Sequence, residues 1–138
     1  MADKITVVPY FYVLVSDEPG QADRLLEHLS ERGLNLLGFT AFPEQPGKTK
    51  LVFITDRKEK LQEAAADAGA ELRGPESAFL IHGQDRIGAL HEHHLALAHA
   101  GINMRASCGV GDGTGRFGIF ILVDPKDFDR AAWAFDFV

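Results

Sequence analysis

The sequence has little of several features that mark particular classes of protein. It holds one cysteine, Cys108, so it can form no internal disulfide and can build no thiolate metal site from cysteine alone. No apolar run reaches the roughly 18 residues that are needed to cross a bilayer. The first residues, Met1 to Lys4, lack the charged and then apolar layout of a secretory signal. We therefore expect a cytoplasmic protein that does not span a membrane.

Basic residues are also few, because 14 Lys and Arg stand against 20 Asp and Glu, and the net charge is -6. Nucleic acids and anionic membranes are bound by basic surfaces, so neither is an expected partner. With 46% hydrophobic and 25% charged residues, the composition is that of a globular protein and not of a disordered chain. The 138 residues suffice for one ordinary domain or for two very small ones.

An internal repeat favours the two small domains. When the sequence is aligned with itself so that Asp17 falls on Asp85, its two halves match without a gap. Many matches are glycine, asparagine or aspartate, which have backbone roles at the ends of elements. The matching pairs include Asp17 and Asp85, Gly20 and Gly88, Leu29 and Leu97, Gly33 and Gly101, Asn35 and Asn103, Gly47 and Gly115, Asp56 and Asp124, and Lys58 and Lys126. We therefore divide the chain into a first repeat, residues 1–74, and a second repeat, residues 75–138, with a turn-like joint at 73–77.

Hydrophobic patterning predicts the element order β-α-β-β-α-β in the first repeat, and the second repeat follows it. In the first repeat we expect strands at 10–16, 34–42, 49–55 and 70–73 and helices at 19–32 and 57–68. Gly33 should end the first helix and Asp56 should cap the second. In the second repeat we expect strands at 78–83, 102–110 and 117–123, helices at 86–100 and 125–135, and a flexible glycine-rich hairpin at 111–115. This pattern is an α+β fold.

The second repeat ends before the position of a fourth strand of its own. In a β-α-β-β-α-β fold that strand borders the first one, so its absence leaves an unpaired edge. The first repeat does not need the N-terminal residues 5–8. These residues are therefore our candidate to fill the edge.

Two pairs of short motifs carry a resemblance to a known family. Asp17-Glu18-Pro19-Gly20 precedes the first helix, and Gly33-Leu34-Asn35 follows it. The pattern returns as Asp85-Arg86-Ile87-Gly88 and Gly101-Ile102-Asn103. Together with the repeat, these motifs resemble the ACT domain over nearly the whole chain. The resemblance implies two ferredoxin-like repeats, with antiparallel sheets and helices on one face, that bind amino acids and regulate amino-acid metabolism. Such domains usually pair, and the ligand sits where two of them meet.

By this resemblance, the ligand-binding residues are Asp17, Pro19, Gly20, Gln21 and Asn35 in the first repeat and Asp85, Ile87, Gly88, Ala89 and Asn103 in the second. A loop that runs into a helix start presents free backbone N–H groups and the positive end of the helix dipole. That environment suits the α-carboxylate of an amino acid. Glycine lets a ligand approach the backbone, and an asparagine amide offers both donors and an acceptor.

Each of these residues also has a structural interpretation. The glycines can relieve crowding in a tight turn, the aspartates can cap the helices, and the asparagines can satisfy local backbone groups. Ile87 stands where the family usually has a proline. One of the two sites can therefore be degenerate and serve only as a pairing surface.

The helix predicted at 86–100 contains four histidines: His91, His93, His94 and His99. His91 and His94 are three residues apart and so share a helical face, which is a spacing that can chelate a metal. The repeat aligns His93 and His94 with two leucines of the first helix. We therefore expect at least one half-buried imidazole.

Our leading hypothesis is a non-enzymatic regulatory protein that senses an amino acid at an interface between ACT-like domains. It has no catalytic residues, no metal and no cofactor. We expect a homodimer that passes its signal to a protein target. The main alternative is a small enzyme or metal-binding protein on a ferredoxin-like scaffold, which would use the histidine-rich helix. A third alternative is a dimerisation module with no ligand.

Overall fold

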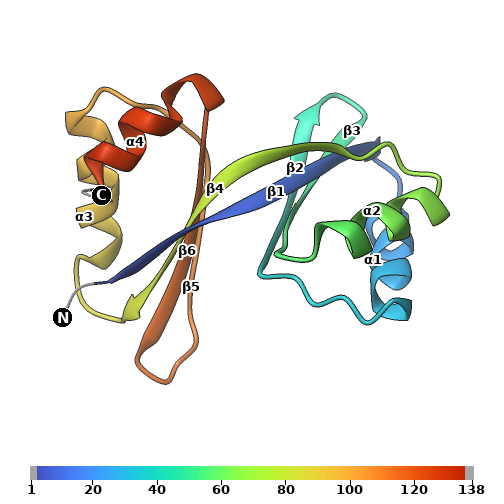
Figure 1. The fold of residues 1–138 in the computed structure, drawn as a ribbon, viewed down its shortest axis with the longest axis horizontal. Coiled ribbons are helices and arrows are strands. Elements are labelled where there is room, and N and C mark those ends of the chain that lie inside the picture. The colour runs from blue at the N-terminus through green and yellow to red at the C-terminus, as the bar shows by residue number, and fades with distance from the viewer. Residues whose placement is uncertain (1–2, 136–138) are drawn as a thin grey trace. The chain divides into compact units, whose positions relative to one another are not determined.

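The computed structural model describes residues 3–135 (Figure 1). Its elements are β1 (Lys4–Ser16), α1 (Gln21–Glu31), β2 (Gly38–Gln45), β3 (Lys48–Ile54), α2 (Lys58–Asp67), β4 (Arg73–Gln84), α3 (Ala89–His99), β5 (Met104–Gly111), β6 (Arg116–Val123), a short 3-10 helix η1 (Pro125–Asp127) and α4 (Phe128–Ala134). This order confirms the α+β class predicted from the sequence. None of the helices among the described residues is long and apolar enough to cross a membrane.

The described chain divides into two compact units, each of which is built like one repeat. The first unit holds residues 8–76, and the second holds residues 77–135 together with residues 3–7. The strand order is β2-β3-β1-β4 in the first unit and β1-β4-β6-β5 in the second. The pairs β1–β3, β2–β3, β4–β6 and β5–β6 are antiparallel. Helices α1 and α2 belong to the first unit and α3 and α4 to the second (Figure 1).

The strand register repeats along with the sequence. Val13 on β1 pairs with Leu51 on β3. Their counterparts in the second repeat, Ile81 and Ile119, pair between β4 and β6. The hairpin strands β2–β3 and β5–β6 show the same correspondence over most of their length. Residues that are aligned in the sequence repeat therefore occupy equivalent positions in the two sheets. The two units can be compared residue by residue.

Strands β1 and β4 each run through both units. Residues 4–7 of β1 lie in the second unit. There the Thr6 hydroxyl donates to the Leu80 carbonyl of β4 (3.3 Å), and Ile5 packs on the core. The N-terminal segment thus occupies the edge that we expected it to fill. Residues 73–76 of β4, in turn, provide the last strand of the first unit.

The predicted turn at residues 73–77 is wrong, because these residues begin β4. The pair Gly74-Pro75 is typical of turns, and this local preference misled the sequence-based interpretation. Gly74 has a φ of +111°, and a Cβ on it would lie 2.9 Å from the Tyr10 carbonyl oxygen. Only glycine combines this backbone conformation with so close an approach to β1.

The start of β2 and the capping of α2 also differ from the prediction. Strand β2 begins at Gly38 and not at residue 34, because the Leu34 N–H donates to the Leu29 carbonyl (3.0 Å) and closes the end of α1. The predicted cap Asp56 does not cap α2. The Thr55 hydroxyl instead accepts a bond from the Arg57 N–H (2.9 Å) next to the helix start. Its counterpart Asp124 does cap η1, accepting from the Lys126 N–H (3.1 Å).

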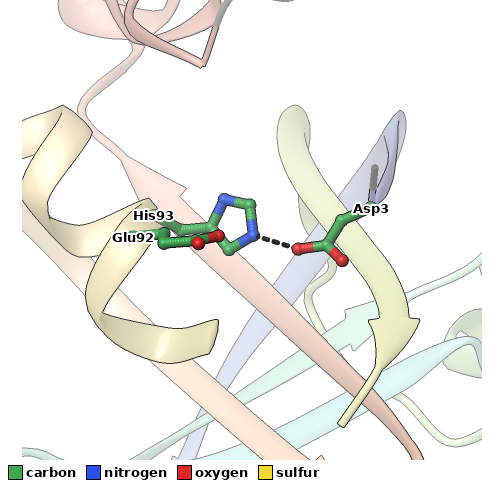
Figure 2. A group of neighbouring side chains, drawn as sticks. All are labelled: Asp3, Glu92 and His93. Atoms are coloured by element: carbon green, nitrogen blue, oxygen red, sulfur yellow. Dashed lines mark hydrogen bonds and ion pairs between the residues drawn. The ribbon is translucent and has the colours of Figure 1, made fainter. Parts of the chain in front are cut away.

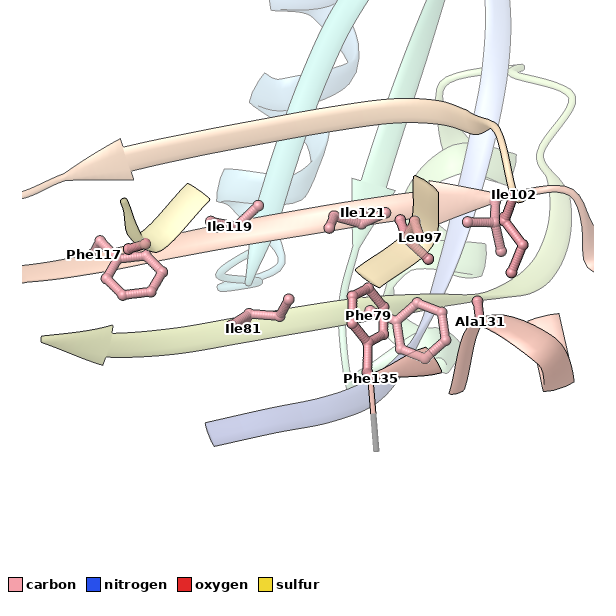
Figure 3. Packing of buried hydrophobic residues seen from close by; sticks show 11 residues of the cluster. Phe79, Ile81, Leu97, Ile102, Phe117, Ile119, Ile121, Ala131 and Phe135 are labelled. Carbon is pink, nitrogen blue, oxygen red and sulfur yellow. The ribbon is translucent and has the colours of Figure 1, made fainter. Parts of the chain in front are cut away.

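Each unit has its own hydrophobic core between the sheet and its helices. The core of the second unit places alternate residues of β4 and β6 against α3 and α4 (Figure 3). Alternation along a strand puts every second side chain on one face, so one face of the sheet is apolar. The largest buried members of this core are Phe79, Ile81, Leu97, Ile102, Phe117, Ile119, Ile121 and Phe135. The corresponding core of the first unit includes Phe11, Leu25, Leu29, Leu51, Phe53 and Leu61.

Candidate functional site

The structure places most of the predicted site residues around the starts of α1 and α3. Gly20 and Gly88 immediately precede these helices with φ values of +91° and +88°, a left-handed conformation that favours glycine. A Cβ on either residue would meet nothing within 4 Å, so the backbone conformation and not crowding requires glycine. Neither helix has a side-chain cap. Capping therefore does not account for Asp17 and Asp85.

The two asparagines lie at the opposite ends of the same helices. Asn35 and Asn103 are exposed and follow α1 and α3. Each helix has 11 residues, which corresponds to about 16 Å at 1.5 Å per residue. Within one unit, the structure therefore does not bring the asparagine together with the glycine of its repeat. Pro19 and Ile87 are exposed in the loops that precede the helices.

A hollow of about 410 Å³ opens beside the start of α3 in the second unit. Three predicted site residues line it: Asp85, Gly88 and Ala89. Further walls come from α3, β5 and β6 and include Leu90, His91, Gly109, Gly111, Phe117 and Ile119. The volume is within the range of small-molecule sites, which combine apolar walls with a few polar groups. We call this feature the α3 hollow.

Two glycines of β5 leave room for the α3 hollow. A Cβ on Gly109 would lie 3.3 Å from the Leu90 side chain, and a Cβ on Gly111 would lie 3.4 Å from the Asp85 Oδ2 atom. The first unit has Ala41 and Pro43 at these two positions. The predicted hairpin at 111–115 is thus partly strand, because Gly111 is the last residue of β5.

The two loop aspartates have different surroundings. The Thr49 hydroxyl donates to the Asp17 carboxylate in the first unit (3.3 Å). The counterpart of Thr49 in the second unit is Phe117, which has no hydroxyl to offer. Among the described residues, the Asp85 carboxylate has no hydrogen-bond partner, and it lies over Gly111. Asp85 therefore presents a carboxylate to the hollow that Asp17 does not present in its own unit.

The first unit has a different hollow, of about 300 Å³, on the side of α1 that faces the end of α2. Gln21, a predicted site residue, lines it together with Val15, Arg24, Leu25 and Glu71. In the second unit an ionic cluster occupies the corresponding place. In the repeat alignment, Gly83, Glu92 and His93 of this place are the counterparts of Val15, Arg24 and Leu25.

This ionic cluster joins the N-terminal segment to α3. Asp3, whose side chain is 4% exposed, accepts bonds from Arg86 through both carboxylate oxygens (2.9 and 3.1 Å). It also bonds the His93 Nε2 atom at 2.7 Å (Figure 2). Arg86 forms a second ion pair with Glu92. Burial raises the pKa of the Asp3 carboxyl, but the hydrogen bonds from Arg86 and His93 outweigh it, and the resulting pKa is below the ordinary value.

Among the described residues, Asp3, Glu92 and His93 are the group that could offer three ligand atoms to a metal, within 4.8 Å of one another. The Arg86 guanidinium already supplies the positive charge between the two carboxylates. These contacts hold the pKa of Arg86 above its ordinary value, chiefly through the bond to Asp3. The cluster is therefore satisfied by the chain's own cation.

The histidines of α3 have separate roles. His93 is the half-buried imidazole that the repeat predicted, with 12% of its side chain exposed. His94 uses both ring nitrogens, bonding the Leu90 carbonyl (2.7 Å) and the Ser107 hydroxyl (2.9 Å). His91 lines the α3 hollow and a neighbouring hollow of about 420 Å³. His94 lines this second hollow as well, but both of its ring nitrogens are already bound to Leu90 and Ser107.

No family model and no curated protein matches the sequence. Solved structures do match it. The protein BT0572 from Bacteroides thetaiotaomicron superposes with a TM-score of 0.79 at 16% identity, over 96% of this chain and 88% of that one. The ligand-free regulatory subunit of aspartate kinase from Thermus thermophilus gives a TM-score of 0.67 at 18% identity, over 97% and 94%. The corresponding subunit from Thermus flavus gives 0.63 at 19% identity, over 99% and 95%. The chain therefore shares the fold of these structures, in agreement with the fold that the ACT-like motifs implied.

In this fold, each candidate loop precedes the first helix of its unit. At these identities the likeness establishes the fold alone. The nature of a ligand has to be inferred from the residues of this chain. Sequence reasoning missed the two features that set the second unit apart, the Asp3 cluster and the strand glycines Gly109 and Gly111. The glycines were visible as Gly where the aligned first repeat has Ala41 and Pro43. Asp3 carried no such signal, because its partners lie in the other half of the sequence.

Proposed function

We propose that this tandem ACT chain is a non-enzymatic regulatory protein that binds an amino acid. The observation that supports the proposal most strongly is the α3 hollow, where Asp85, Gly88 and Ala89 of the predicted loop meet apolar walls. The solved structures of similar fold include regulatory subunits of aspartate kinase. A cytoplasmic location belongs to the same proposal.

The start of α3 supplies suitable chemistry for the head group of an amino acid. The first N–H groups of a helix have no partner within the helix, and the dipole favours an anion there. The Asp85 carboxylate lies in the loop before this helix start. An α-carboxylate and an α-ammonium group can therefore be bound side by side.

Regulation would follow from a change in the equilibrium between paired and unpaired ACT units. A ligand shifts an equilibrium only by binding one state better than the other. We propose that the amino acid does so by favouring a pairing of ACT units, within a homodimer or with a protein target. The enzymatic alternative has weaker support, because His94, one of its two candidate groups beside His91, is held in bonds to Leu90 and Ser107.

A thermal-shift screen of the purified chain against the twenty amino acids, one at a time at millimolar concentration, tests the proposal. A ligand at about 100 times its dissociation constant stabilises a protein by roughly 2.7 kcal/mol. For a chain of this size that corresponds to a rise in melting temperature on the order of 5–15 °C. We expect one amino acid, or a few related ones, to produce such a rise. If none of the twenty does, the amino-acid proposal is wrong.

A further inference from the structure

We infer that the chain has one amino-acid site, in the α3 hollow of the second unit, and that its ligand is an α-amino acid with an apolar side chain. This inference rests on the proposed function and makes it more specific in two ways. It assigns the site to one of two homologous units, and it names the chemical class of the ligand side chain.

The polar groups of the α3 hollow match the head group of an amino acid. The Asp85 carboxylate lies over Gly111 and, among the described residues, has no hydrogen-bond partner. It is placed to accept bonds from an α-ammonium group. His91 lines the hollow from the first turn of α3 and is placed to donate an imidazole N–H to an α-carboxylate. A positively and a negatively charged ligand group thus each have a complementary partner.

The remaining walls determine the ligand side chain. Leu90, Phe117 and Ile119 line the hollow, and Phe117 and Ile119 belong to the buried core of the unit. Arg86 is the one Lys or Arg among the lining residues, and it is already bound to Asp3 and Glu92. A charged ligand side chain would be left without a partner beside these apolar walls, which costs free energy. An apolar side chain gains by the same burial.

The equivalent place in the first unit differs at each of these points. Ala41 and Pro43 replace the two glycines. The Asp17 carboxylate accepts a bond from Thr49, so it is less available to a ligand. Asp23 stands at the position of His91 and would repel an α-carboxylate. These differences favour binding to the second unit alone.

Isothermal titration calorimetry of the full chain with L-leucine, L-phenylalanine, L-aspartate and L-lysine tests the inference. We expect L-leucine or L-phenylalanine to bind with one site per chain, and the two charged amino acids to bind at least roughly 10-fold more weakly. Asp85→Asn should weaken binding roughly 10-fold or more, because the ammonium loses its charged partner. The matched variant of the first unit, Asp17→Asn, should bind as the parent chain does.

A second pair of variants keeps the test valid if Asp85→Asn unfolds. Gly111→Ala places a methyl group beside the Asp85 carboxylate and should weaken binding of the same amino acid. Gly118→Ala should not, because the atoms nearest to its Cβ, from His82 and the Ile81 carbonyl, would lie at ordinary contact distances. Melting temperatures of all four variants show that they are folded.

The outcomes separate this inference from the proposed function. If none of the twenty amino acids binds, the proposed function fails and the inference fails with it. If an amino acid binds at two sites per chain, or if Asp17→Asn abolishes binding while Asp85→Asn does not, the function stands and the single site is overturned. If L-aspartate or L-lysine binds more tightly than the apolar amino acids, the ligand class is overturned.

Discussion

The Asp3 carboxylate lies against Gly83, in the space that any side chain at position 83 would occupy. A Cβ on Gly83 would be 2.8 Å from the Asp3 Cγ atom and equally close to the Phe117 ring, distances at which something must shift. The absence of a side chain on β4 thus allows the N-terminal segment to place its carboxylate beside Arg86 and His93. The counterpart of Gly83 in the first unit is Val15, and no such ionic cluster is described there.

Gly83→Ala should destabilise the protein mainly by expelling the Asp3 carboxylate. We expect a loss of about 2 kcal/mol in the free energy of unfolding, the scale of hydrogen bonds to charged groups, and a similar loss for Asp3→Ala. The double variant should lose clearly less than the sum of the two, because both changes break the same contacts. Urea unfolding of the single and double variants measures this. Fully additive losses, or a loss as large for Gly118→Ala, would show that Asp3 is not the reason for the glycine.

The Asp3 cluster should make stability depend on pH in the acid range. The pKa of Asp3 is lowered in the folded chain, so the unfolded state takes up the proton first as the pH falls. The stabilisation should be complete above about pH 5, decline as the pH falls through the ordinary pKa near 4, and vanish below the lowered value. Compared with the parent chain, Asp3→Asn should therefore be less stable at pH 7, and the difference should shrink toward pH 3.

Urea unfolding at several pH values measures this difference. Asp56→Asn is the control, because Asp56 is exposed and no hydrogen bond of its side chain is described. Its stability should run parallel to that of the parent chain. A difference between the parent chain and Asp3→Asn that stays constant down to pH 3 would contradict the lowered pKa.

Removal of residues 1–7 should lower the melting temperature. Residues 4–7 form the last strand of the second unit, and Ile5 packs against its core. Their loss leaves an unpaired strand edge and removes the Asp3 contacts. We expect weaker protection of the β4 amides in hydrogen exchange, with the β3 amides of the first unit less affected. An unchanged melting temperature and exchange pattern would show that the segment is dispensable.

Asp56, which follows β3, and Asp124, which follows β6, should differ in their contribution to the stability of the protein. The bond from the Lys126 N–H holds the pKa of Asp124 below its ordinary value, whereas Asp56 does not cap α2. Asp124→Ala should therefore lower the melting temperature by a few degrees, on the order of 2–5 °C, and Asp56→Ala should change it little. Differential scanning calorimetry compares the two. Equal effects would contradict the assignment of the cap.

Local sequence signals predict much of the fold. Gly33 is expected at the end of the first helix, and it adopts a positive φ value there, because only glycine enters that conformation at little cost. The alignment of His93 with Leu25 predicts a half-buried imidazole, which the structure confirms. These successes share a cause, since each depends on a few neighbouring residues or on the repeat.

Features that depend on distant residues are not predictable in this way. The pair Gly74-Pro75 favours a turn by its local preference, but pairing with β1, far earlier in the sequence, makes it part of a strand. Asp85, Gly88 and Ala89, which the sequence suggests as ligand-binding residues, line one hollow. On the opposite wall, Gly111 was assigned to a flexible hairpin because strand propensity disfavours glycine. Tertiary pairing overrides that preference.

Nuclear magnetic resonance most directly tests the claim that an amino acid binds in the α3 hollow. The uniformly 15N-labelled chain is titrated with L-leucine and L-phenylalanine, and the backbone amide shifts are followed. The account predicts that the largest changes cluster at residues 85–91 and 109–111, which surround the hollow. The amides around Gly20 and Ala41 should change little. Shifts concentrated in the first unit, or none at millimolar ligand, would contradict the account.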